Sequence, residues 1–116
     1  MSSPVAASPA ASFTIFVLLR ALPAWLSLSR SRRNEIASAA MAHAFTDAAV
    51  TLRHFDAEAF TAVCSDVSVF ETSDLAAFYF TMERLRDTPL FAAPYFELVH
   101  IIPAIEDGFR RFELAA

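Results

Sequence analysis

The hydrophobic pattern of this chain alternates between the period of a strand and the period of a helix. The segment Phe13 to Ala21 (FTIFVLLRA) is rich in β-branched and aromatic residues, which favours a strand. Its odd-numbered positions are all apolar, and so are Phe16 and Leu18 on the opposite face. Both faces of this strand therefore need to be covered in the folded protein.

A helical period follows from Arg30 to Phe45. Ile36, Ala40 and Ala44 recur at the spacing of one helix face, and Ser29 is a suitable N-cap residue. Because this face consists mostly of alanine, the helix can approach a sheet closely but buries little apolar area. The first turn carries the arginines of the sequence RSRR, at the end where the helix dipole disfavours cations. These arginines either face solvent or bind an anion.

Two further strands are predicted in the middle of the chain. Val50 to Asp56 (VTLRHFD) alternates along its length, and its polar members are typical of an edge strand. Asp66 to Thr72 (DVSVFET) places two valines on one face and Phe70 on the other. Residues 57–65 are predicted to form the connection between these two strands.

A second helix is predicted from position 75 onward. Its apolar face is formed by side chains at i, i+3, i+7 and i+10, which are Leu75, Phe78, Met82 and Leu85. Thr72 or Ser73 is suited to the N-cap, and Asp74 adds a favourable negative charge to the first turn. We expect the helix to end near Pro89, because proline cannot continue the hydrogen-bond ladder.

The fourth strand is predicted at Tyr95 to Ile102 (YFELVHII). Strict alternation would place four of its residues on one face, namely Phe96, Leu98, His100 and Ile102. The final stretch, residues 103–116, is too short for another domain. The order of strand, helix, strand, strand, helix and strand predicts an α+β protein with the ferredoxin-like βαββαβ topology and an antiparallel sheet.

In this fold both helices cover the same face of the sheet, which leaves the other face bare. The first and fourth strands are apolar on both faces, so we expect a second copy of the chain to supply the cover. The sequence therefore predicts a homodimer of one ferredoxin-like domain, residues 13–116. Residues 1–12 (MSSPVAASPAAS) contain mainly Ser, Ala and Pro without periodicity, and we predict a disordered tail there.

Composition and charge argue against several classes of protein. Hydrophobic residues make up 56% of the 116 residues, but the longest apolar run contains Arg20 and Pro23. No segment therefore offers the roughly 20 consecutive apolar residues of a membrane span. The net charge is −4 and the arginines are spread along the chain, which argues against a nucleic-acid partner. Cys64 has no second cysteine to pair with, so we expect a cytoplasmic protein.

Several long segments of the chain resemble the darcynin family of small bacterial proteins. The resemblance runs from about Phe13 to Phe112 and rests on FTIFVLLRALPAWLSLSR, HFDAEAF, SDVSVFETSDLAAFYF and LRDTPLFAAPYFELVHIIPAIEDGF, which occur in order. It implies a dimeric α/β-barrel-type assembly, in agreement with strands that are apolar on both faces. It implies no activity, because that family has none assigned.

The polar residues that stand out are two histidines on otherwise apolar strand faces, where an unpaired polar group is costly. One interpretation is a ligand pocket lined by His54, Asp56, Tyr79 and His100, with a histidine as acid or base. The other is that each histidine is hydrogen-bonded locally inside a dimer core. The two histidines lie on strands at opposite edges of the predicted sheet, so they would meet only across a dimer.

No motif for a metal or a cofactor is found. The histidines, the cysteine and the acidic residues lack the spacings of metal-binding motifs, and a single glycine excludes a phosphate loop and a nucleophile elbow. We therefore predict neither metal nor cofactor. Two functions remain open: a dimeric module that binds a small apolar ligand between its sheets, or a cofactor-independent oxygenase or isomerase with His54 or His100 as the base.

Overall fold

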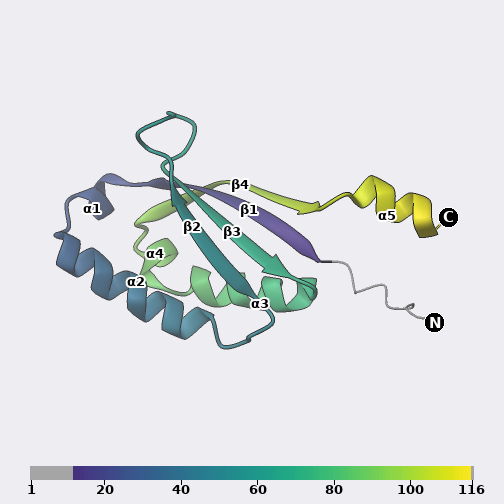
Figure 1. The fold of residues 1–116 in the computed structure, drawn as a ribbon. Coiled ribbons are helices and arrows are strands. Elements are labelled where there is room, and N and C mark those ends of the chain that lie inside the picture. Colours follow the sequence, from purple (N-terminus) through teal and green to yellow (C-terminus); the bar gives the residue numbers. More distant parts are fainter. Residues whose placement is uncertain (1–11, 116) are drawn as a thin grey trace.

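The chain folds into a four-stranded antiparallel sheet with helices on one of its faces (Figure 1). The strands are β1 (Phe13–Ala21), β2 (Thr51–Asp56), β3 (Asp66–Thr72) and β4 (Phe96–Ile105), and their order in the sheet is β2-β3-β1-β4. The computed structural model describes residues 12–115, so the predicted tail lies outside the described residues except for Ser12. The ferredoxin-like α+β fold predicted from the sequence is confirmed.

Among the described residues, two long helices cover the sheet, and three shorter ones connect the strands or follow the last of them. The long helices are α2 (Arg30–Ala44) and α3 (Leu75–Arg86), and the others are α1 (Pro23–Leu26), α4 (Pro89–Ala92) and α5 (Gly108–Ala115). Figure 1 shows α2 and α3 side by side against the sheet, whereas α5 projects beyond the end of β4. Within residues 12–115, no helix combines the length and apolar character of a membrane span.

The core lies between the sheet and the helices, and β1 is its centre. Ile15 and Val17 are almost completely buried, and they meet Phe70 of β3, whose ring is 2% exposed. Ala40 and Ala44 of α2 are buried in the same cluster. The small side chains of α2 allow the helix to approach the sheet, as the alanine-rich pattern indicated.

The first predicted N-cap is confirmed, and the second was assigned one or two residues too early. The Ser29 side chain accepts a hydrogen bond from the backbone N–H of Arg32 at 3.1 Å. In α3 the cap is Asp74, whose carboxylate accepts from the N–H groups of Ala76 and Ala77 at 3.0 and 3.2 Å. A carboxylate at this position satisfies two free N–H groups and complements the helix dipole.

β4 departs from the strict alternation expected from its sequence. Leu18 pairs with His100, whereas the next residue of β1, Leu19, pairs with Leu98. This shift marks a β-bulge, in which one extra residue, Val99, reverses the faces of the residues that follow. The prediction of one shared face was therefore wrong, because Leu98 faces the helices and His100 faces the opposite side of the sheet.

The side of the sheet away from the helices carries exposed apolar side chains. Phe16 on β1, Phe55 on β2 and Ile102 on β4 are 37%, 43% and 47% exposed. Phe16 and Ile102 are direct partners in the β1–β4 register, so they form one continuous patch. Within residues 12–115 no helix covers this open face, as the sequence pattern predicted.

The cap of α3 leads to a stability prediction. Asp74→Ala removes an acceptor from two helix N–H groups, so the free energy of unfolding should fall by about 1 kcal/mol. Chemical denaturation followed by circular dichroism measures this change. Ser73→Ala is the matched control, because Ser73 is exposed and is not the N-cap, and it should leave the free energy of unfolding unchanged. Equal effects of the two substitutions would contradict the assignment of the cap.

Candidate functional site

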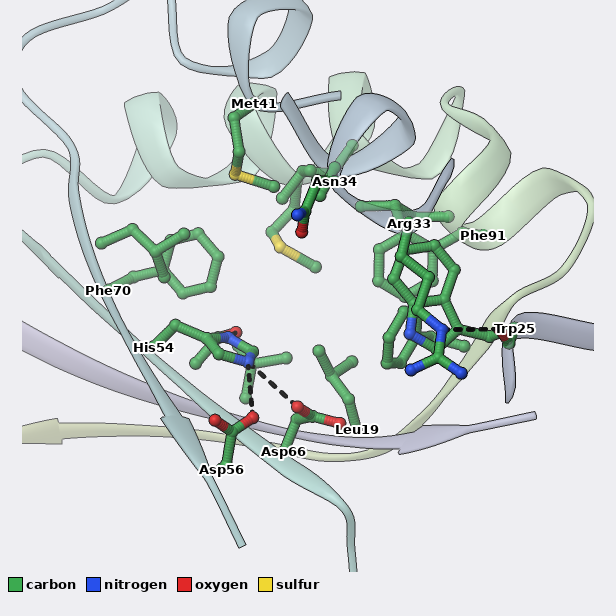
Figure 2. Close-up of a pocket in the computed structure, with 18 of the residues that line it drawn as sticks. Leu19, Trp25, Arg33, Asn34, Met41, His54, Asp56, Asp66, Phe70 and Phe91 are labelled. Atoms are coloured by element: carbon green, nitrogen blue, oxygen red, sulfur yellow. Dashed lines mark hydrogen bonds and ion pairs between the residues drawn. The ribbon is translucent and has the colours of Figure 1, made fainter. Parts of the chain in front are cut away.

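A cavity of about 550 Å³ lies between the helix-covered face of the sheet and α2, and it is partly open to solvent (Figure 2). This volume falls within the range of sites that hold small molecules. The cavity is lined by residues of one chain. The ligand space expected from the sequence lay instead between the two sheets of a dimer.

Most of the cavity wall is apolar. The sheet contributes aliphatic and aromatic side chains, including Val17, Leu19, Leu52, Phe70 and Phe96. The helical side contributes Trp25, Met41, Met82, Leu85, Leu90 and Phe91. The Trp25 ring packs against Phe96, with 5.0 Å between the ring centroids.

The cavity exists because α2 presents small side chains to the edge of the sheet. β2 directs Leu52 and His54 towards the helices, and the facing residues of α2 include Ala37 and Asn34. An alanine-rich helix leaves volume that larger side chains would fill, and β2 is an edge strand with only one neighbouring strand. The sequence predicted that this helix face buries little apolar area, and in the structure the space that its small side chains leave is the cavity.

His54 is held at one end of the cavity by two hydrogen bonds. Its Nδ1 lies 3.1 Å from Oγ of Ser68, and its Nε2 lies 3.0 Å from Oδ1 of Asp66. Asp66 is itself fixed by the Ser65 hydroxyl, which donates to its other carboxylate oxygen at 2.6 Å. His54 and its carboxylate partner therefore have a defined orientation at the cavity wall.

The pairing changes the proton affinities of both groups. The hydrogen bond to Asp66 raises the pKa of His54 above its ordinary value, although burial acts in the opposite direction. Burial raises the pKa of Asp66, but the hydrogen bonds from His54 and Ser65 outweigh it and leave that pKa below its ordinary value. Protonated His54 and ionised Asp66 thus stabilise each other.

A second carboxylate joins this corner of the cavity. Asp56 ends β2 and pairs with Asp66 of β3 in the strand register, and its carboxylate lies 3.9 Å from Nε2 of His54. Ligand atoms of His54, Asp56 and Asp66 all lie within 4.8 Å of one another, so together these residues could hold a metal ion. Sequence spacing did not indicate this cluster, because it depends on pairing between strands.

The opposite wall of the cavity carries basic and amide groups from the start of α2. Arg30, Arg33 and Asn34 line it, and Figure 2 shows Asn34 directed towards the interior. The guanidinium of Arg33 donates to the carbonyl oxygens of Trp25 and Leu26 at 3.1 and 2.7 Å. Arg33 therefore holds α1 in place beside the cavity.

The structure brings together two of the four residues predicted to line a pocket. His54 and Asp56 line the cavity. Tyr79 is on the exposed side of α3, where the neighbouring Glu83 raises the pKa of its phenol by a hydrogen bond. His100 is exposed on the open face of the sheet, on the side away from His54. A sheet-to-sheet dimer would therefore not bring the two histidines together.

The sequence pattern did not indicate that Asp66, Ser68, Trp25 or Asn34 are site residues. Asp66 and Ser68 stand opposite Asp56 and His54 in the β2–β3 register, and that register was not predicted. The only available signal was their position at alternate places on the third strand, on the same face as Phe70.

Comparison with known families gives one match that spans nearly the whole chain. Residues 3–115 match the family described as Darcynin, domain of unknown function. Darcynin 1 of Acinetobacter baumannii is 40% identical over 89 residues, which cover 76% of this chain and 99% of that protein. Darcynin of Chromobacterium violaceum is 59% identical over 64 residues, which cover 55% of this chain and 81% of that protein.

Solved structures with similar folds are distant in sequence. A heme-binding protein from Thermus thermophilus matches with a TM-score of 0.75 and 15% identity, over 90% of this chain and 44% of that protein. Chlorite dismutase from Candidatus Nitrospira defluvii, in complex with imidazole, matches with a TM-score of 0.73 and 15% identity, over 84% of this chain and 41% of the enzyme. The chain thus spans less than half the length of these structures, and the likeness establishes the fold alone.

The charge pairing at the cavity leads to a prediction for His54. In metal-free buffer, NMR titration should give a His54 pKa above 6.5 in the wild type, and Asp66→Asn should lower it. Because the pKa of His54 is raised on folding, its stabilising contribution is complete below pH 6.5 and is lost as the pH rises through the folded-state value. The contribution of Asp66, whose pKa is lowered, is lost as the pH falls through its folded-state value.

The free energy of unfolding gives a second measurement of the same pair. The difference between wild type and Asp66→Asn should be greatest between about pH 4 and 6.5, at roughly 1 kcal/mol or less because His54 is partly exposed. A difference that grows steadily above pH 7 would have the wrong sign and would contradict the pairing.

Proposed function

The chain belongs to the darcynin family, and from this premise we propose that it is a binding protein that takes up a small, largely apolar ligand in the cavity between the sheet and α2. The observation that carries the proposal is the cavity itself, with about 550 Å³ of space and walls that are mostly aliphatic and aromatic. A few polar groups converge at its ends, where His54 and Asp56 would contact the ligand and fix its orientation.

Heme is not the ligand that these residues support. One structural neighbour is a heme-binding protein, but the only histidine among the residues that line the cavity is His54. Both of its ring nitrogens already have hydrogen-bond partners, Ser68 and Asp66. An axial histidine needs a free ring nitrogen to bind the heme iron, so we propose that the ligand is a molecule other than heme.

A cofactor-independent enzyme is the second candidate, and the pair of His54 and Asp66 favours it. Asp66 orients the imidazole through Nε2 at 3.0 Å, as a carboxylate orients the histidine of a general base, and Nδ1 would take a proton through the Ser68 hydroxyl, which lies 3.1 Å away. His100 has no such role in this cavity, because it lies on the other face of the sheet. Recovery of a bound ligand chemically unchanged after long incubation, as measured by mass spectrometry, would support binding over turnover.

We also propose that two copies associate through the open faces of their sheets. Phe16 and Ile102 form an apolar patch on β1 and β4, and Val69 extends it as the direct partner of Phe16 on β3. An apolar patch that spans three neighbouring strands is typical of an interface between protein surfaces. A second identical face offers a complementary apolar surface under two-fold symmetry.

Ligand uptake by the cavity can be measured with a neutral apolar dye. N-phenyl-1-naphthylamine should bind saturably and gain fluorescence, and Ala37→Phe should weaken binding at least about tenfold by filling the cavity. Ala39→Phe is the matched control, since Ala39 is exposed on α2 and does not line the cavity. Equal affinity of the two variants would contradict the proposal, provided that circular dichroism shows both to be folded.

The proposed assembly can be tested by sedimentation equilibrium at micromolar concentration. The wild type should have the mass of a dimer, and Phe16→Asp should shift it to the monomer by placing a charge in the apolar interface. Phe60→Asp should remain a dimer, because Phe60 lies in the loop between β2 and β3, outside the apolar patch on the strands. A wild-type protein that is monomeric under these conditions would refute the assembly.

A further inference from the structure

The polar groups of the cavity form two sets of opposite charge on different walls. One set lies at the start of α2 and includes Arg30 and Asn34. The other lies at the ends of β2 and β3 and consists of His54, Asp56 and Asp66. A ligand in the cavity would meet basic and amide groups on the helical wall and acidic groups on the sheet wall.

The basic wall, formed by Arg30, Arg33 and Asn34, includes two side chains that have no hydrogen-bond partner among the described residues. Arg32 is paired with Glu35 at 3.0 Å, and Arg33 is bound to two carbonyl oxygens. The side chains of Arg30 and Asn34 form no hydrogen bond or ion pair with any residue in the described range 12–115, and they are one helical turn apart. Cations in the first turn oppose the helix dipole, and α2 has no acidic residue there to offset them.

An anionic group in the cavity would relieve this unfavourable arrangement. Arg30 would supply the positive charge and Asn34 an amide N–H, and a carboxylate accepts hydrogen bonds from both types of donor. The sequence RSRR left two explanations open, a solvated surface or a bound anion. The position of Arg30 and Asn34 on the cavity wall favours the anion.

The acidic corner, formed by His54, Asp56 and Asp66, would instead bind a hydrogen-bond donor of the ligand. Two carboxylates face each other across β2 and β3, and among the described residues His54 is the one basic side chain that lies within ion-pair distance of them. The carboxylate of Asp66 is already hydrogen-bonded to His54 and Ser65. The Asp56 side chain is 77% exposed and its distance to His54 is 3.9 Å, so its oxygens can accept hydrogen bonds from a ligand.

The surface between the two walls suits a flat apolar body. The rings of Trp25, Phe70, Phe91 and Phe96 line the cavity together with aliphatic side chains. Aromatic rings pack favourably against other rings in offset and edge-to-face arrangements. The aromatic lining therefore favours a ligand with an aromatic ring between its polar groups.

We propose that the ligand is a small aromatic carboxylic acid with a hydroxyl or amino group at the end opposite its carboxylate. The carboxylate binds Arg30 and Asn34, the ring packs between the aromatic side chains, and the hydroxyl or amino group donates a hydrogen bond to Asp56. This inference rests on the proposed binding function and adds the chemical class of the ligand to it.

Three probe compounds separate the contributions of the two ends. 4-Hydroxyphenylacetate has both polar groups, phenylacetate lacks the hydroxyl, and 4-hydroxyphenylethanol lacks the carboxylate. Trp25 is the only tryptophan of the chain and lines the cavity, so its fluorescence reports binding directly. We expect 4-hydroxyphenylacetate to bind at least about tenfold more tightly than either of the other two, because each lacks one charge-assisted hydrogen bond.

Substitutions in each wall test which residue contacts the carboxylate of the ligand and which contacts its hydroxyl group. Arg30→Gln should remove most of the preference for 4-hydroxyphenylacetate over 4-hydroxyphenylethanol. Arg32→Gln is the matched control, since Arg32 is in the same helical turn but does not line the cavity. Asp56→Asn should instead reduce the preference for 4-hydroxyphenylacetate over phenylacetate. Arg30 and Asp56 are both exposed, so these changes should leave the fold intact.

The possible outcomes distinguish this inference from the proposed function. If the three compounds bind equally, or if Arg30→Gln and Arg32→Gln have the same effect, the assignment of the ligand class is overturned. If none of the compounds binds while N-phenyl-1-naphthylamine does, the cavity is a binding site but the ligand class is wrong. If neither the compounds nor the dye binds, both the inference and the proposed function fail.

Discussion

The central strand β1 is apolar on both faces, and this constraint shapes the rest of the structure. Ile15 and Val17 require a cover of helices on one side, whereas Phe16 requires one on the other. The helical cover is incomplete at the edge of the sheet, because the small side chains of α2 do not fill the space above β2. The same helix that closes the core over β1 therefore leaves a cavity beside it.

The polar corner of the cavity is a product of strand pairing. The β2–β3 register places Ser68 opposite His54 and Asp66 opposite Asp56, so residues 12 to 14 positions apart become hydrogen-bonded neighbours. An imidazole at this position would be costly without partners. Hydrogen bonds to the Ser68 hydroxyl and the Asp66 carboxylate offset this cost and orient the imidazole towards the cavity. The same contacts therefore stabilise the edge of the sheet and position a polar group of the site.

Several elements could be predicted from local patterns, and the exceptions have local causes. The strands Phe13–Ala21 and Asp66–Thr72 have the predicted bounds, and α2 begins at the predicted cap. Of the two histidines that the sequence offered as possible pocket residues, only His54 lies at the cavity wall. His100 lies on the other face because a single bulge residue in β4 reversed the alternation, and a bulge has no clear signature in an apolar strand.

The sequence by itself determined the order of the elements, the two apolar faces of β1 and the alanine-rich face of α2, because these depend on periods of two and 3.6 residues within short segments. Only the tertiary structure decided which polar residues meet. Asp66 joins His54 through the register of two strands, and Arg30 lines the same cavity as this acidic corner, between a helix and a sheet. Such contacts depend on the packing of segments that are distant in sequence, and no local period encodes that packing.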